Sequence, residues 1–115
     1  MKKLTRLHIH LLGPAGGPLG ASYDQLVQRL TAIERLHYEP DGSLLWSGQQ
    51  WQIGGMIYDR AEIVQYVELQ GTLPVDQWQH LIRAILGPHG QASVLWLQDQ
   101  SLHDLQSFEN RAWSR

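Results

Sequence analysis

Apolar and polar residues alternate over positions 4–12, near the start of the chain. The apolar members of this alternation are Leu7, Ile9 and Leu11, and the polar members are Arg6, His8 and His10. A period of two predicts a β-strand with one buried face. The next segment, 13–20, is rich in glycine and proline, so the strand ends there and a loop follows.

Two later segments have apolar residues at helical spacing. The first follows Ser22, and Gln25 stands three residues further on, which is the pattern of a capping box. Apolar residues then recur at a period close to 3.6, and this predicts a helix over 23–36. The second helix begins near Pro74, where the first turn tolerates a missing N–H, and it ends at Gly87.

Three short apolar segments between these helices predict strands at 43–46, 51–58 and 63–70. Each is joined to the next by only four residues, so the connections are hairpins and the three strands form an antiparallel meander. A fifth strand is predicted over 92–98 on the same grounds.

Ser101, with Asp104 three residues on, predicts the start of a last helix. The predicted order of elements is therefore β-α-β-β-β-α-β-α. The fold class is α/β (α+β), with a single mixed β-sheet, the three-stranded antiparallel meander in its middle, and helices packed on the sheet. A length of 115 residues suffices for one domain, spanning 1–115.

Composition narrows the function. The chain has no cysteine, which excludes disulfides, thiolate metal sites and cysteine nucleophiles. No apolar run reaches the ~18 residues of a membrane span, so we expect a cytoplasmic protein with no membrane partner. The formal net charge is −2, and the only lysines are Lys2 and Lys3, so the sequence lacks the basic footprint of a nucleic-acid partner.

The segment 51–71 holds one pattern with candidate chemistry. The triplet Glu-Leu-Gln at 68–70 lies late in the third meander strand and is followed by a glycine and the second helix. This hairpin resembles the active site of the restriction-endonuclease-like PD-(D/E)xK nucleases, whose core order α-β-β-β-α-β matches positions 23–98. The resemblance implies a nuclease-like fold in which Glu68 is the acid of the acid-x-Lys triplet, working with Mg²⁺ or Mn²⁺.

Two positions depart from that family's pattern. Its aspartate should fall at Gly54 or Gly55, which have no side chain, and its lysine position holds the neutral amide of Gln70. Mg²⁺ is usually held through one or two carboxylates plus substrate phosphates, so Glu68 alone makes an incomplete metal site. The nearest other acid, Asp59, lies at the hairpin tip. We therefore expect no enzyme activity; a nuclease would have to use Glu68, Gln70 and Asp59.

His8 and His10 project from one face of the first strand, ~7 Å apart. Zinc sites use three or four protein ligands, and the other histidines have no paired spacing. Two half-exposed polar residues are the simpler interpretation, and no metal cofactor is expected. The candidate ligands, should a metal bind, are His8, His10 and Glu68.

Five tryptophans are many for a chain of this size. Trp46, Trp51 and Trp113 are the least easily buried, and tryptophan is enriched at interfaces. Thirteen glutamines and few charges also suit a surface that contacts protein. The favoured hypothesis is a non-catalytic protein-interaction or assembly module, self-associating, on a degenerate nuclease-like core. The alternatives are a metal-dependent nuclease with a rearranged site and a small-ligand or metal-binding domain.

Overall fold

One β-sheet, with helices packed against it, makes up the computed structural model, which describes residues 3–88 and 90–114. Within these residues the strands are β1 (Leu4–Leu12), β2 (His37–Tyr38), β3 (Ser43–Gly48), β4 (Trp51–Arg60), β5 (Ile63–Pro74), β6 (Ser93–Trp96) and β7 (Ser101–Asp104). The helices are α1 (Tyr23–Thr31), α2 (Val75–Leu86), α3 (Leu105–Ala112) and a 3₁₀ turn, η1 (Pro14–Gly16). No helix in this part of the chain is long and apolar enough to cross a membrane.

The strand order across the sheet is β2-β3-β4-β5-β1-β6-β7, which confirms the α+β class and the central meander of β3, β4 and β5. Every pairing between the described strands is antiparallel, whereas the sequence pattern predicted a mixed sheet. The reason lies in β1, which separates β5 from β6. The crossover through α2 makes β5 and β6 run in the same direction, but β1 lies between them and is antiparallel to both.

Two strands were not predicted. The first helix ends at Thr31 rather than Leu36, because residues 32–36 form turns, one of them closed by the Leu36 N–H donating to Ile33. The chain then adds β2 to the edge of β3.

The second missed strand is β7. Ser101 lies in β7, and Asp104 is the N-cap of α3, accepting a hydrogen bond from the Ser107 N–H at 2.8 Å. The helix start predicted at Ser101 is therefore three residues too early.

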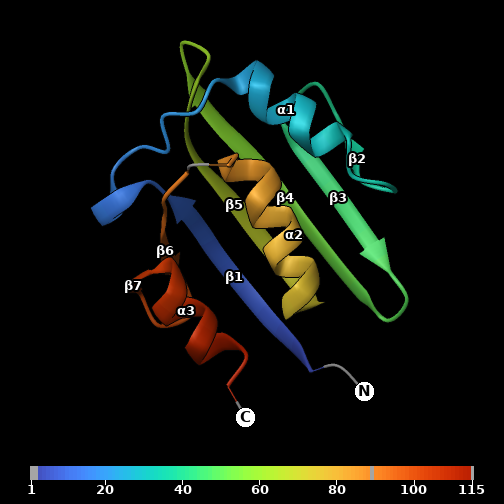
Figure 1. The fold of residues 1–115 in the computed structure, drawn as a ribbon, viewed down its shortest axis with the longest axis vertical. Coiled ribbons are helices and arrows are strands. Elements are labelled where there is room, and N and C mark those ends of the chain that lie inside the picture. The colour runs from blue at the N-terminus through green and yellow to red at the C-terminus, as the bar shows by residue number, and fades with distance from the viewer. Residues whose placement is uncertain (1–2, 89, 115) are drawn as a thin grey trace.

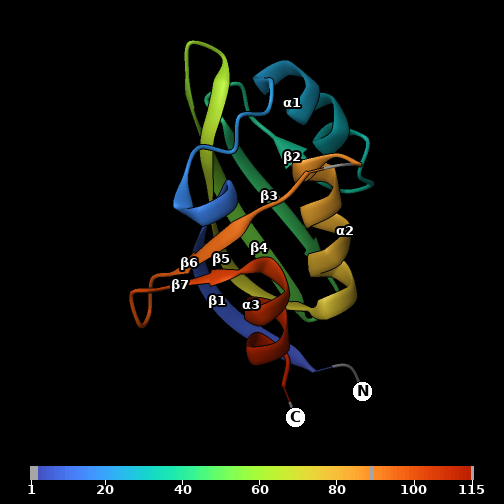
Figure 2. The ribbon, with the colours of Figure 1, turned by 60° about the vertical axis from the view of Figure 1, so that its left-hand side comes forward.

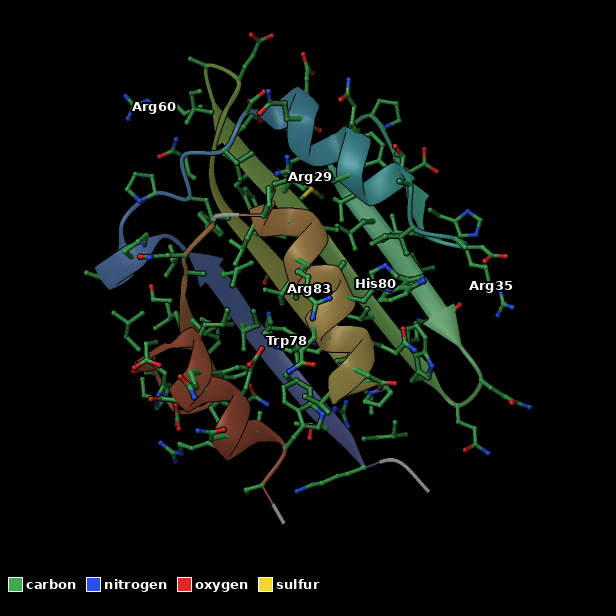
Figure 3. The ribbon with its side chains drawn as sticks, in the orientation of Figure 1. Arg29, Arg35, Arg60, Trp78, His80 and Arg83 are labelled. Carbon is green, nitrogen blue, oxygen red and sulfur yellow. The ribbon has the colours of Figure 1, made fainter. Side chains whose placement is uncertain are left out.

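The α-helices α1, α2 and α3 cover the same face of the sheet (Figures 1 and 2). Neighbouring helices touch: Trp78 of α2 packs against Phe108 of α3, with ring centroids 5.3 Å apart. Arg29 of α1 reaches the end of α2 (Figure 3), where its guanidinium donates to the carbonyl oxygens of Ala84 and Ile85 at 2.7 and 3.1 Å. These donors satisfy carbonyls that the last turn of a helix leaves unpaired.

The core lies between the sheet and these helices. Leu7, Ile9 and Leu11 of β1 are fully buried there, as their alternation predicts. The residues between them on β1 point to the opposite side, where none of the three helices lies (Figure 2). We call this side the open face of the sheet.

Candidate functional site

A group of polar and aromatic side chains gathers on the open face. We call it the His–Glu–Tyr cluster, and its members are His8 and His10 of β1, Tyr66 and Glu68 of β5, and Tyr58 of β4. Strand alternation points each member outward, and register brings them together. His10 stands directly opposite Glu68, and Tyr58 stands opposite Tyr66. Cross-strand pairs of this kind bring Cβ atoms within ~5 Å.

The carboxylate of Glu68 is the centre of the cluster. Its Oε2 atom accepts a hydrogen bond from His8 Nε2 at 2.7 Å and lies 3.9 Å from His10 Nε2. Its Oε1 atom accepts from the Tyr58 hydroxyl at 3.4 Å. The side chains of His8, His10 and Glu68 are 34%, 25% and 30% exposed. The group is therefore partly desolvated yet open to a ligand from solvent.

Ring stacking fixes the orientation of the aromatic members. The His10 and Tyr66 rings lie 4.5 Å apart, tilted by 30°, and Tyr66 stacks on Tyr58 at 4.6 Å and 20°. Offset stacking of this kind adds about 0.5–1.5 kcal/mol per pair. It also restricts the rotation of the imidazole of His10.

The surroundings shift two pKa values. Burial lowers the pKa of His10; the carboxylate of Glu68 opposes this, and His8 adds to it. The pKa of Tyr58 is raised by desolvation first, and then by the charge of Glu68 and the neighbouring Tyr66. Both shifts favour the neutral side chain, so near neutral pH His10 is an uncharged imidazole and Tyr58 a hydroxyl that can donate.

Next to the cluster the open face is hollowed. An open hollow of about 310 Å³ is lined by Leu45, Gln52, Gly54, Gly55, Met56, Glu68 and Gln70. A Cβ atom at Gly54 would meet its nearest neighbours at 3.6 and 3.7 Å, which is ordinary contact. The backbone therefore does not require glycine at position 54, and the missing side chain leaves room for a ligand.

The hollow coincides with the positions that the nuclease resemblance singles out. Gly54 stands opposite Gln70, and both lie on the open face with Glu68. A Cβ at Gly55 would instead clash with the backbone of β5, because it would lie 2.5 Å from the backbone carbonyl oxygen of Glu68. Asp59 lies beyond a register shift near the hairpin tip, where its carboxylate accepts from the Glu62 N–H at 3.3 Å.

These residues do not fit the Mg²⁺ that the family uses. The pattern supplies one carboxylate, Glu68, whose two oxygens are engaged by His8 and Tyr58. Gly54 and Gln70 add neither a second carboxylate nor a cation. The nuclease resemblance itself stays a prediction.

The three tryptophans predicted to lie at an interface have different surroundings in the structure. Trp46 is only 5% exposed; its indole N–H donates to the Glu34 carbonyl at 3.1 Å, and it packs edge-on against His80, labelled in Figure 3. The prediction that Trp46 lies at an interface is therefore wrong. It points to the helix-covered side, where an indole fills the space between β3 and α2.

Trp113 also serves the fold. It is half-buried, its N–H donates to the Leu73 carbonyl at 3.1 Å, and its ring lies 5.5 Å from that of Trp78. Trp51 is half-buried and lies over Gly48, at which a Cβ would come within 2.4 Å of the indole. Of the three candidates, Trp51 has the clearest place at the surface, because it lines three surface hollows.

Three members of the cluster were candidate residues from the sequence, whereas Tyr58 and Tyr66 were not. The signal for Tyr66 was present, because alternation along the third meander strand puts it on the face of Glu68. Tyr58 needs the register of the hairpin as well.

Comparisons of the chain with protein-family models, with curated proteins and with solved structures found no match. The fold and the site together define an α+β protein with a one-sided sheet and a His–Glu–Tyr cluster on its open face.

Proposed function

We propose that this protein is a non-catalytic assembly module that pairs with a second copy of itself through the open face of its sheet. The observation that carries the proposal is the uncovered face itself. An antiparallel sheet can keep one face in water when that face is polar. Here the outward rows include Leu45, 42% exposed, and Tyr58, 40% exposed, with Met56 and Tyr66 half-buried beside them.

The size of the face suits a dimer. The molecule measures 40 × 31 × 24 Å, and the sheet extends along the two longer axes (Figure 1). Its open face therefore has an area on the order of 1,000 Å², compared with ~800 Å² per partner in a standard interface.

Charge favours a second copy over a strongly charged partner. The face carries the exposed cation Arg6 towards one end of β1 and the carboxylate of Glu68 further along. A two-fold axis between these groups brings each over the opposite charge of the other copy, as an isologous interface requires. The net charge of −2 gives only weak repulsion between copies.

Light scattering coupled to size exclusion tests this proposal over a hundredfold concentration range. We expect a mass of twice the 13.1 kDa of one chain. Leu45→Arg, which adds a cation to the open face on β3, should restore the monomer mass. Gln28→Arg adds the same charge on the exposed side of α1 and should leave the dimer intact. A wild-type monomer throughout, or equal effects of the two variants, would contradict the proposal.

One observation keeps a nuclease ancestry as a second candidate: Gly54, Glu68 and Gln70 share the open face. We infer an inactive site, because the positions of the family's aspartate and lysine hold the uncharged residues Gly54 and Gln70. The protein should not cleave single-stranded or double-stranded DNA or RNA with Mg²⁺ or Mn²⁺. Cleavage that disappears in Glu68→Ala would instead establish a nuclease.

The converse variant tests the ancestry. Gly54→Asp combined with Gln70→Lys restores the family's pattern on the same face, and the hollow has room for the aspartate. Divalent-metal binding gained by the double variant would support ancestry, and the absence of any gain would count against it.

A further inference from the structure

Three metal-ligating side chains converge on one point of the open face. The Nε2 atoms of His8 and His10 lie 2.7 and 3.9 Å from the same oxygen of Glu68. All three side chains come from the paired central strands β1 and β5, so the strand ladder fixes their backbone. The sequence expectation of no metal rested on the two histidines of one strand; the register of β1 with β5 places Glu68, the third candidate ligand, beside them.

We propose that His8, His10 and Glu68 form a binding site for a zinc-class transition-metal ion. Two imidazole nitrogens and one carboxylate oxygen form a donor set that suits zinc, whereas Mg²⁺ and Ca²⁺ prefer oxygen ligands alone. The fourth position is open to water or to a group from a ligand. Every ligand comes from one chain, so the site does not need a second copy, although Glu68 is also the carboxylate that faces Arg6 of the other copy in the proposed dimer.

The required movements are small. Zinc bonds of ~2.0–2.1 Å in a tetrahedral site place neighbouring donor atoms ~3.3 Å apart. The distance of 2.7 Å between His8 Nε2 and Glu68 Oε2 must therefore increase. The distance of 3.9 Å between His10 Nε2 and the same oxygen must decrease. Each change is about 0.6 Å. Changes of this size are within the range of side-chain rotation, so neither strand has to move.

The hydrogen bond between His8 and Glu68 explains why the three ligands do not already stand in metal-binding positions. Among the described residues, no three or more His, Asp or Glu side chains stand where they could hold a metal ion. The hydrogen bond from His8 to Glu68 draws the carboxylate towards one imidazole. A bound ion takes the place of the hydrogen on His8 Nε2, and the neutral ring then carries its hydrogen on Nδ1.

Neighbouring groups hold the ligands in place. The Tyr58 hydroxyl donates to the Glu68 oxygen that faces away from the histidines, at 3.4 Å, and the Tyr66 ring stacks on His10. Outer partners that orient metal ligands typically contribute about 10- to 100-fold to affinity. Tyr58 is therefore a positioning residue of this site.

Calorimetric titration of chelator-treated protein with ZnCl₂ tests the site, and we expect one ion per chain. At an excess of about 100-fold over the dissociation constant, zinc should raise the melting temperature by roughly 10 °C. His8→Gln, His10→Gln and Glu68→Gln should each weaken binding more than tenfold, and Tyr58→Phe by about tenfold. His37→Gln, at an exposed histidine of β2, is the matched control and should bind as the wild type does.

Two further measurements keep the test decisive. Co²⁺ in the wild-type protein should give the intense visible absorption of a four-coordinate ion, a result that needs no variant to fold. The Leu45→Arg monomer should still bind zinc, which separates this site from the dimer. Binding that survives His8→Gln and His10→Gln, Mg²⁺ binding of equal strength, or no binding of Zn²⁺ or Co²⁺ would each overturn the proposal.

Discussion

Gly54 and Gly55 are adjacent on β4, and the structure predicts opposite responses to the same substitution. A methyl group at position 55 would lie 2.5 Å from the carbonyl oxygen of Glu68 and 2.8 Å from Cδ2 of Leu69. The carbonyl belongs to the backbone of the neighbouring strand, so it cannot move aside. At position 54 the nearest atoms are 3.6 and 3.7 Å away, and a methyl group makes normal contacts.

The magnitudes follow from these distances. Replacing glycine by alanine within a strand gains about 0.5–1 kcal/mol in the free energy of unfolding when the backbone allows it. Forcing an extra methyl group into a packed position costs about 1–3 kcal/mol. Gly54→Ala should therefore be neutral or stabilising, and Gly55→Ala should destabilise the protein. The two variants should differ by about 2–3 kcal/mol.

Thermal unfolding measures this difference. The unfolding entropy of globular proteins, ~2.1 cal/mol/K per residue, amounts to about 240 cal/mol/K for this chain. One kcal/mol then shifts the melting temperature by about 4 °C, and the two variants should melt about 10 °C apart. Equal melting temperatures, or a less stable Gly54→Ala protein, would refute both the assignment of Gly54 to the open face and the close approach of β4 to β5 at Gly55.

Three other predictions concern the stability of the fold. Ala61 and Glu62 form the β4–β5 turn with φ of 51° and 68°. Ala61→Asn combined with Glu62→Gly should therefore raise the free energy of unfolding by about 1 kcal/mol in urea titrations, and a lower free energy of unfolding would argue against the turn. Trp113→Ala removes a ring from the aromatic core and the donor to Leu73, and should cost about 3 kcal/mol without changing the dimer mass; an unchanged melting temperature would contradict this role. The Ser107 backbone N–H, and then its hydroxyl, lower the pKa of Asp104. The ionised cap therefore stabilises the fold above pH ~4, and this contribution is lost as the pH falls through the lowered pKa. Asp104→Asn should flatten the acid side of the curve of stability against pH, and an unchanged curve would refute the cap.

The sequence predicted what depends on local pattern. The alternation over 4–12 gives β1 its full extent, since each buried residue is two positions from the next. Short connections likewise determine the meander, because a link of a few residues between strands can only reverse the chain. The end of α1 was missed because the two-residue edge strand that follows it leaves only a weak local signal. β7 was missed because Ser101 and Asp104 are both good N-cap residues, and only the pairing with β6 shows which one begins the helix.

The candidate site depends on pairing between distant segments. His8 and His10 were correctly placed on one face by alternation. Their contact with Glu68 depends on the register of β1 against β5, which joins residues about 60 positions apart. No periodicity in either segment specifies that register. The burial of Trp46 was missed for the same reason, since only the packing of α2 on the sheet shows which side of β3 is covered.

The central position of β1 has a consequence for how the chain folds during synthesis. The first strand made has its partners at β5 and β6, so its apolar side must wait, unpaired, until most of the chain has emerged. The hairpin of β4 and β5 is local and can form well before β1 is paired. Contacts between distant segments slow folding, and docking of β1 between β5 and β6 is the step that should limit its rate. Lys3 donates to the carbonyl of Ser114, so the first and last described residues lie close together. A circular permutant that places β1 after α3 would therefore deliver this strand last, to partners already formed.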